Sequence, residues 1–335
     1  MFSGLEIAQA PDFRRHLNKY DVIHIDIQWF LANCENADEV VSFITKSVLD
    51  ELREIYPGTL PTEFVKLPDA LSRVKEKTGQ KFIIIDEWDV LIRDGEVSEI
   101  IQDGYINFLR GMFKGTEPTK YIQLAYLTGI LPIKKEKAQS AVNNLDEFTM
   151  LQAFGLAPYI GFTENEVKNL CEKYNRDFEK VKKWYDGYLL DDYQVYNPKA
   201  VISLMTKGKF RSYWSETGSY AVVIPLICMN FDGLKTAIIE MLSGAEVEVN
   251  TASFKNDPAK IQNRDDVITY LIHLGYLGYN EEKGTAFVPN EEIRQELSTA
   301  VRNSHWDEMV SFQQESRKLL LATLARDEKR RTYRV

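Results

Sequence analysis

An apolar run that ends in two carboxylates, Lys81–Glu87, constrains the fold of this chain more than any other segment. Its residues 82–85 are all hydrophobic, and Asp86 and Glu87 follow directly. Such a run fits a strand that is buried on both faces, as in a parallel sheet. Two similar runs, at residues 22–27 and 121–129, are separated from it by amphipathic segments. Strands that alternate with helical patterns favour βαβ units and an α/β fold.

The segments between these runs have the periodicity of amphipathic helices. In residues 38–55 the apolar side chains recur at helical spacing, and a Pro-Gly pair ends the pattern. The same reasoning predicts helices at 67–78, before Gly79, and at about 100–113. We therefore expect three parallel strands joined by helices within residues 1–150.

The second half of the chain has a different pattern. Short helices are predicted at 164–174, 177–185, 198–206, 265–274 and 291–301. Between the last two, residues 275–279 and 285–288 flank a turn in which Gly284 can supply a positive φ. Helix, hairpin and helix is the coarse pattern of a winged-helix-like unit. We predict a mainly helical lid domain at residues 151–320, which contains this unit, and a polar tail at 321–335.

Composition sets the protein class. The chain has 335 residues, of which 44% are hydrophobic and 27% charged, and this excludes a mainly disordered chain. Its net charge of −9 argues against a nucleic-acid-coating surface, although a local basic patch is compatible with it. Three scattered cysteines have no metal-binding spacing, and the longest apolar run contains Pro225. We expect a soluble, cytoplasmic protein without a membrane span.

The two carboxylates after the apolar run have the form of a Walker B motif. Asp86 suits a hydrated Mg²⁺ on a nucleotide, and Glu87 suits the polarisation of an attacking water. The position also fits, because ligands of open parallel sheets bind beyond the carboxyl ends of the strands. The alternative is a buried strand that ends in a solvated polar turn.

A second polar residue follows the third apolar run. Thr128 would lie beside the carboxylates and could sense a γ-phosphate, or it could simply cap a loop. The sequence contains no G-x-x-x-x-G-K-S/T pattern. A cradle of backbone N–H groups for phosphates therefore cannot be built from this chain alone.

Several segments together resemble a family of predicted AAA-ATPase-like proteins, whose members are often fused to a PD-(D/E)xK-type nuclease domain. The matching segments are Met1–Ile7, Phe82–Asp89, Leu127–Ile133, Asn143–Met150, Trp184–Tyr188, Tyr196–Pro198, Ser212–Ser219 and Leu271–Tyr279. The resemblance implies a P-loop-type parallel sheet and ATP with Mg²⁺ as ligands. It also implies that Asp86 holds the metal through water, that Glu87 orients water, and that Thr128 senses the γ-phosphate. Asn143 is a candidate contact to the nucleotide.

The chain departs from this family pattern at both ends. In the family, a strand and a Walker A loop precede the segment that matches Met1, and a nuclease domain follows the lid. Here the C-terminal sequence ends in a basic stretch at 330–335. We therefore expect a partial P-loop core, truncated before its Walker A segment and before the nuclease domain.

Other candidate residues allow two interpretations. Asp26 could support the metal site, or it could be a polar strand end; Asp89 could act in catalysis, or it could bond the backbone. Asn143 could reach the nucleotide or pack on the lid. The aromatic residues Trp184, Tyr185 and Tyr188 could stack on a base or anchor the second domain to the first. We expect His24 to be a core residue.

Two functions follow from the sequence. The first is an ATPase-like module that hydrolyses ATP in a full-length protein and switches a linked nuclease or another partner, while this chain alone is inactive. The second is a non-enzymatic module that binds protein or nucleic acid; the acidic starts of the two helices that flank the hairpin oppose phosphate contact there.

The expected truncation predicts a marginal fold. A missing inner strand would leave two strand edges without ladder partners, so we expect early, broad thermal unfolding and aggregation. Differential scanning calorimetry and light scattering test this. A sharp, cooperative transition from a monomeric solution would contradict it.

Overall fold

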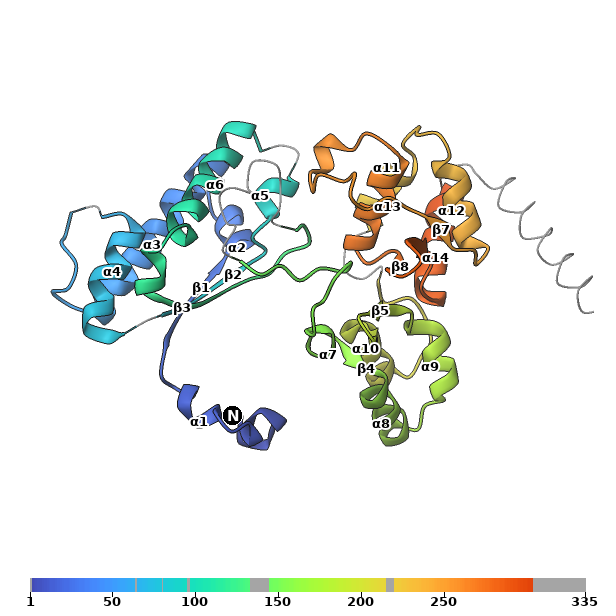
Figure 1. Cartoon of the computed structure of the whole chain (residues 1–335), viewed down its shortest axis with the longest axis horizontal. Coiled ribbons are helices and arrows are strands. Elements are labelled where there is room, and N and C mark those ends of the chain that lie inside the picture. The colour runs from blue at the N-terminus through green and yellow to red at the C-terminus, as the bar shows by residue number, and fades with distance from the viewer. Residues whose placement is uncertain are drawn as a thin grey trace, which may run out of the picture. The chain divides into compact units, whose positions relative to one another are not determined.

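The computed structural model describes residues 2–63, 65–79, 81–94, 97–132, 145–214 and 220–303. The chain divides into two compact units (Figure 1). The first comprises Met1–Glu147 together with Asn256–Ala259, and the second comprises Phe148–Lys255 and Lys260–Val335.

The first unit is a mixed α/β structure in which helices alternate with three strands. The strands are β1 (Asp21–Asp26), β2 (Lys81–Asp86) and β3 (Ile122–Leu127). The helices are α1 (Phe13–His16), α2 (Ile27–Ala32), α3 (Val40–Ile55), α4 (Leu67–Thr78), α5 (Val90–Arg93) and α6 (Glu99–Phe113). The predicted α/β fold and its three strands are confirmed.

The three strands form a parallel sheet in the order β1-β2-β3. Asp26 lies beside Asp86, and Ile85 lies beside Leu127. The β2–β3 pairing is irregular at its start: Lys81 pairs with Ile122, but the next residue pairs with Leu124. One extra residue of β3, Gln123, is therefore accommodated at the end of the sheet opposite the carboxylates.

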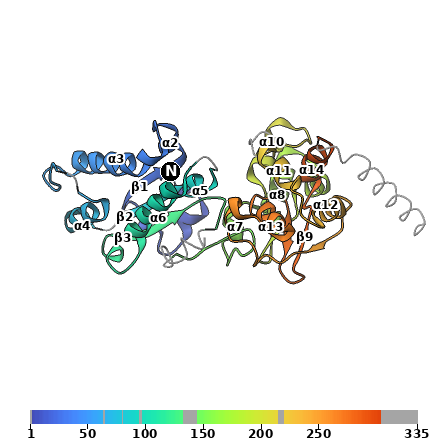
Figure 2. The same cartoon turned by 90° about the horizontal axis from the view of Figure 1, so that it is seen from above.

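One face of this sheet packs against helices. Ile25, Ile83 and Ile85 point to this face and are fully buried. Helices α3, α4 and α6 pack on one another and lie on the same side of the sheet (Figures 1 and 2). Their buried apolar residues recur at helical spacing, as in α3 at Ile44 and Val48, which explains why these segments fold as helices.

The opposite face of the sheet carries large apolar side chains that remain exposed. Val22, Leu124 and Tyr126 lie on this face, and each is more than half exposed. His24, which we expected in the core, lies on the same face and is exposed. Alternation along β1 points it away from the helix-covered side, so the expectation of a core histidine is wrong.

The second unit is mainly helical and contains two small antiparallel sheets. Its helices are α7 (Ala157–Ile160), α8 (Glu164–Tyr174), α9 (Phe178–Tyr185), α10 (Pro198–Lys207), α11 (Tyr220–Ile227), α12 (Leu234–Leu242), α13 (Arg264–His273) and α14 (Glu291–Asn303). Its strands are β4 (Phe162–Thr163), β5 (Tyr188–Leu190), β6 (Tyr193–Tyr196), β7 (Val247–Glu248), β8 (Gly278–Asn280) and β9 (Thr285–Phe287). Across the described parts of both units, every helix is too short or too polar to cross a bilayer.

Local capping explains where these helices start and stop. Thr163 and Glu166 form a reciprocal capping box at the start of α8. The Asn197 side chain accepts a hydrogen bond from the Ala200 N–H at the start of α10, and Gly208 ends that helix in a left-handed conformation. The buried rings of Tyr185, Tyr196 and Tyr213 lie in the core between these helices; the full cluster is Val167, Cys171, Val181, Tyr185, Tyr196, Ala200, Val201, Leu204, Met205 and Tyr213.

The predicted helix, hairpin and helix is present at the C-terminal end of the described chain. Strands β8 and β9 pair between α13 and α14, and β7 adds to β9 to give the order β7-β9-β8. Gly284 has φ +65° in the turn, as its position in the sequence predicts. The assignment of this region to the winged-helix class stays a prediction.

A close backbone contact ties this region to the rest of the second unit. Gly187 has φ +107°, and a Cβ at this position would lie 2.2 Å from the carbonyl oxygen of Pro289. Beside it, the Asn290 side chain donates to the carbonyl of Asp186 at 2.8 Å, and the Tyr188 hydroxyl donates to the carbonyl of Gly275 at 2.7 Å. Only glycine fits at position 187, for reasons of both space and conformation.

This contact makes a stability prediction with a matched control. Gly187→Ala should lower the free energy of unfolding by about 3 kcal/mol or more, because the methyl group meets backbone atoms. Gly284 also has a positive φ, +65°, but open space around it, so Gly284→Ala should cost only about 1 kcal/mol. Urea denaturation measures both values, and equal losses would show that the close contact does not matter.

Candidate functional site

The carboxyl ends of β2 and β3 bring three predicted site residues together. Asp86 is the last residue of β2, and Thr128 directly follows β3. The Thr128 hydroxyl donates to Asp86 Oδ1. The backbone N–H of Glu87 lies 3.2 Å from the same oxygen and 3.4 Å from Thr128 Oγ1. The parallel pairing of the strands thus places the carboxylate, the hydroxyl and the start of the next turn within one small network.

The turn after β2 has a strained backbone. Glu87 has φ +52°, a left-handed conformation that non-glycine residues rarely adopt. Two backbone hydrogen bonds of 2.9 Å fix it, one from Thr128 N to Ile85 O and one from Trp88 N to Thr128 O. Strain of this kind persists where neighbouring contacts impose it, and it is concentrated at functional sites.

The Glu87 carboxylate is held by a cation. Arg93 Nη2, on α5, donates to Glu87 Oε2 at 2.5 Å. Burial raises the pKa of Glu87 above its ordinary value, and the Arg93 charge opposes this shift; the charges of Asp89, Asp86 and Asp26 add to it. The side chain is nevertheless 39% exposed, so water can reach it. In this arrangement the carboxylate is engaged by Arg93.

A buried carboxylate, Asp89, also contacts Arg93. Its side chain is fully buried, and Oδ2 accepts hydrogen bonds from Ile130 N at 3.1 Å and Leu131 N at 2.7 Å. Arg93 Nε lies 2.9 Å from the same oxygen, an ion pair whose angle does not make a hydrogen bond. Asp89 therefore bonds the backbone, which is the structural role that the sequence left open for it.

Gly129 lies in the centre of these contacts. A Cβ at this position would lie 2.5 Å from Trp88 Cδ1 and 2.7 Å from Asp89 Oδ1. The segment that follows Thr128 can therefore approach the buried carboxylate only if residue 129 is glycine. This links the position of the Thr128 hydroxyl to that of Asp89.

The remaining candidates lie elsewhere or have other contacts. Asp26 Oδ1 accepts a hydrogen bond from Trp29 N at 2.9 Å and caps α2, so it acts as the strand-end residue we considered. Asn143 lies outside the described residues. The rings of Trp184, Tyr185 and Tyr188 belong to the second unit, where Tyr185 and Tyr188 are buried.

The residues at the strand ends offer few metal ligands. Among the described residues, no group of three His, Cys, Asp or Glu side chains could hold a metal ion. Magnesium, however, keeps most of its waters and binds proteins through one or two carboxylates plus substrate phosphates. Oδ1 of Asp86 is hydrogen-bonded, while its Oδ2 makes no hydrogen bond with a described residue. Asp86 fits that mode of binding and does not fit an all-protein cage.

The strand-end site lies in a part of the chain that matches a family model. Residues 1–138 match the AAA-ATPase-like family, which is described as predicted AAA-ATPases. The AAA-ATPase-like region thus contains Asp86, Glu87 and Thr128 and ends within the first unit. It supports an ATPase-like module in the first unit, and it leaves the second unit unmatched.

Individual proteins give weaker likenesses. An uncharacterized protein in the vnfD 5′ region of Azotobacter chroococcum mcd 1 is 30% identical over 151 residues, which is 43% of this chain and 28% of that protein. The chain thus matches little more than a quarter of this relative's length. The Walker-type ATPase PABY2304 of Pyrococcus abyssi has a TM-score of 0.40 at 11% identity, with 87% of this chain and 88% of that chain covered.

A second solved structure is the ORC2 protein of Aeropyrum pernix in ADPNP–ADP complexes. Its TM-score is 0.28 at 11% identity, and 89% of this chain and 83% of that chain are covered. With TM-scores this low, neither structural likeness bears on the function of the chain.

Sequence reasoning missed Arg93, although a signal was present. Arg93 lies four residues after Asp89, the spacing at which opposite charges meet on a helix. A charged pair that begins two residues after the Asp86-Glu87 strand end could have been predicted to belong to the same network. The pairing of Arg93 with Glu87 depends on the turn geometry, which the sequence does not show.

The buried ion pair yields a testable prediction. Asp89→Asn should lower the free energy of unfolding by about 3 kcal/mol, because it leaves Arg93 without its buried partner. The matched control is Asp38→Asn at an exposed position, which should change stability by less than about 0.5 kcal/mol. Chemical denaturation checks both, and equal stability of the two variants would disprove a structural role of Asp89.

Proposed function

We propose that the first unit is the part of an ATPase that carries the metal-binding, water-orienting and γ-phosphate-sensing residues. The observation that supports this is the meeting of Asp86, Glu87 and Thr128 at the carboxyl ends of two parallel strands, inside the region that matches the AAA-ATPase-like family. Open parallel sheets bind ligands at this edge.

Each residue has a separate role in this proposal. Asp86 would hold Mg²⁺ through water with Oδ2, while its Oδ1 accepts the Thr128 hydroxyl. Because this hydroxyl has one proton, Thr128 would have to release Asp86 in order to donate to a γ-phosphate. The metal, when bound with ATP, would neutralise charge on the phosphates. Glu87 would accept a proton from the attacking water or orient it, and burial, which raises its pKa, makes the carboxylate a better proton acceptor.

Two features favour an inactive state of this chain by itself. The sequence has no phosphate-binding loop, so a nucleotide would lack most of its positioning and electrostatic stabilisation. The Glu87 carboxylate is also paired with Arg93 through Oε2, and this positive charge opposes the transfer of a proton to it. Turnover thus requires a strand and phosphate-binding loop in addition to the residues described here.

The proposal also covers the partner of the ATPase and its cellular compartment. The energy of hydrolysis would switch a linked nuclease domain or another partner through the second unit. Asn143 would contact the nucleotide from the connection after Thr128. We propose a cytoplasmic protein, in keeping with the three free cysteines.

Glu87→Gln tests the proposed function. The measurement is Mg²⁺-dependent ATP turnover by a protein in which this chain follows an in-frame strand and phosphate-binding loop, together with ATP binding. We expect Glu87→Gln to reduce turnover roughly 100-fold or more and to leave ATP binding intact. Glu76→Gln, at an exposed position of α4, should have no effect.

Two results would count against this proposal. Full turnover by Glu87→Gln would remove Glu87 from the chemistry. Turnover by the unextended chain that depends on Glu87 would contradict the predicted inactivity.

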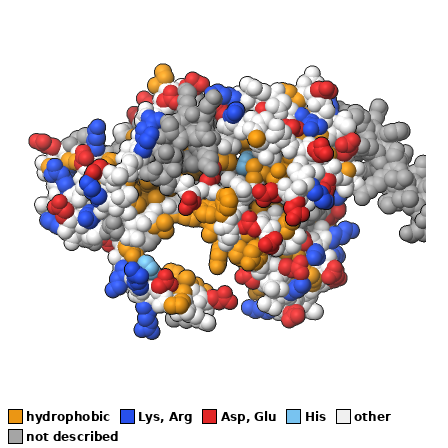
Figure 3. Space-filling model, in the orientation of Figure 1, with side chains coloured by type: hydrophobic (Ala, Val, Ile, Leu, Met, Phe, Trp, Pro, Cys, Tyr) orange, Lys and Arg blue, Asp and Glu red, His pale blue; other side chains and the backbone are white. Residues whose placement is uncertain are grey.

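One observation favours the alternative function, a non-enzymatic module that binds a partner. Because Arg93 pairs with Oε2 of the Glu87 carboxylate, this group is a weaker base than it would be alone. On the face shown in Figure 3, acidic and basic side chains intermix over α8 and α9, so this face does not favour nucleic acid over protein. If a partner binds Glu87→Gln unchanged and ATP has no effect, the chain is an interaction module.

A further inference from the structure

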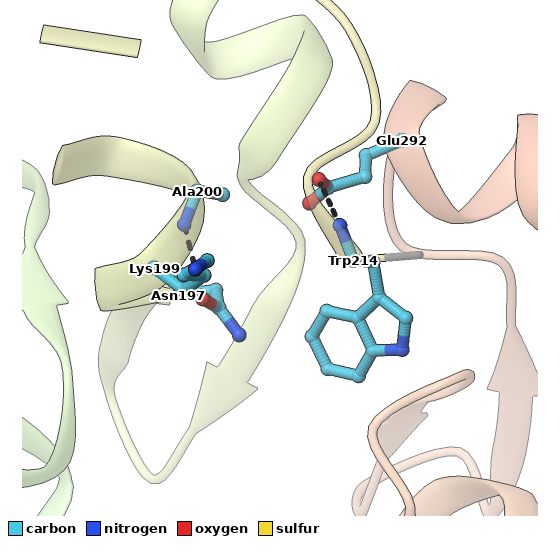
Figure 4. Close-up of a pocket in the computed structure, with 5 residues that line it drawn as sticks. All are labelled: Asn197, Lys199, Ala200, Trp214 and Glu292. Carbon is cyan, nitrogen blue, oxygen red and sulfur yellow. Dashed lines mark hydrogen bonds between the residues drawn. The ribbon is translucent and has the colours of Figure 1, made fainter. Parts of the chain in front are cut away.

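A small hollow in the second unit has an acidic side chain on one side and hydrogen-bond donors on the other. It lies between the start of α10 and the segment that packs on α14, and Asn197, Lys199, Ala200, Trp214 and Glu292 line it (Figure 4). The space inside it that water-sized spheres can reach is about 70 Å³, and it is partly open to solvent. Clefts for drug-sized ligands start at about 300 Å³. The hollow can therefore accept only a small molecule.

One side of the hollow is acidic. Glu292 is 1% exposed, and its Oε1 accepts hydrogen bonds from Tyr213 N at 2.6 Å and Trp214 N at 3.1 Å. Its Oε2 makes no hydrogen bond with a described residue. Glu296, one turn further along α14, is also buried, and neither carboxylate forms an ion pair with a described cation. Buried carboxylates without a cation are costly, so this side favours a positively charged group.

The ionisation of Glu292 agrees with this geometry. Burial raises the pKa of Glu292 to about 7, the two backbone N–H groups oppose the shift, and the charge of Glu296 adds to it. A cation placed against Oε2 would favour the charged form and lower this pKa. The charged form of Glu292 is therefore unfavourable unless a positive group binds next to it.

The other side of the hollow donates hydrogen bonds. Asn197 uses Oδ1 to accept the Ala200 N–H at 3.2 Å, which leaves its amide N–H₂ group to donate. Figure 4 shows this nitrogen on the side that faces the Trp214 indole. Lys199 lies in the first turn of the ten-residue helix α10, where the helix dipole and its own ammonium group both favour an anion.

An aromatic wall lies between the two sides. The indole of Trp214 packs edge-to-face on Tyr276 with ring centroids 5.6 Å apart, and a Cβ at Gly275 would lie 2.9 Å from its ring. These contacts fix the indole in place. Its face can then attract an ammonium group or cover the carbon atoms of a ligand.

We propose that this hollow binds a small zwitterion with a primary ammonium group next to a carboxylate, as in a free α-amino acid. The ammonium group would donate to Glu292 Oε2 beside the Trp214 ring. The carboxylate would accept from the Asn197 amide and lie at the start of α10 near Lys199. The ligand thereby supplies the cation that the buried acidic side lacks and the anion that the donor side favours. This site is independent of the proposed ATPase function.

Isothermal titration calorimetry of the full chain tests this proposal. The probes are glycine, L-alanine and L-serine, with ethylammonium and acetate as compounds that carry only one of the two charges. We expect binding of at least one amino acid at millimolar concentration and at least about tenfold weaker binding of both single-charge compounds.

Two variants change the ligand contacts and keep the structural ones. Glu292→Gln retains an acceptor for the Tyr213 and Trp214 N–H groups but loses the charge. Asn197→Asp retains the cap of α10 but loses the donor. Each should weaken amino-acid binding at least about tenfold. The control Glu291→Gln changes the neighbouring carboxylate on the same helix and should leave the affinity unchanged.

Three results of these titrations would overturn the proposed amino-acid site. Absence of binding by all three amino acids, or equal binding of acetate or ethylammonium, overturns the proposal. So does unchanged affinity in both variants. If Glu292→Gln lowers the thermal unfolding midpoint of the unliganded chain, Asn197→Asp alone decides, because its helix cap is preserved.

Discussion

The buried carboxylate of Asp89 connects two segments on which the strand-end site depends. Through Oδ2 it binds the backbone N–H groups of Ile130 and Leu131, and it pairs with Arg93, which in turn holds Glu87. A charge without solvent contact is tolerated only when such partners surround it. The turn after β2 and the segment after β3 are therefore positioned by one group. Movement of either segment would be transmitted to the Glu87 carboxylate through Arg93.

The two units differ in how their cores are built and in where their polar residues lie. The first uses a parallel sheet with helices on one face, and its polar residues gather where the strands end. The second builds its core from helices and buried tyrosine rings, and it places carboxylates inside that core. The exposed apolar residues on the far face of the sheet, Val22, Leu124 and Tyr126, are unusual for a parallel sheet, which is ordinarily covered on both faces.

The sequence predicts the secondary structure well because the signals are local. The apolar run before Asp86 becomes β2, and Gly284 takes the positive φ of the hairpin turn. It also predicts that Asp86 and Thr128 meet, because parallel strands end at one edge. It cannot predict that Arg93 engages Glu87, since this depends on the left-handed turn at Glu87, or that Glu292 meets Trp214, since these residues are distant in the chain. The exposed His24 shows the same limit, because an apolar run does not reveal which face of its sheet is covered.

The irregular start of the β2–β3 pairing has a consequence at the other end of these strands. Because Lys81 pairs with Ile122 and the next residue pairs with Leu124, Gln123 is an insertion in the ladder. If Gln123 instead paired with Phe82, the ladder would continue without a shift and would bring Leu127, and not Thr128, beside Asp86. Every side chain of β3 would also exchange faces. The register shift at Gln123 thus determines whether the carboxylate meets a hydroxyl or a hydrocarbon, so the chemistry of this edge depends on the pairing at the far end of the strands as much as on their terminal residues.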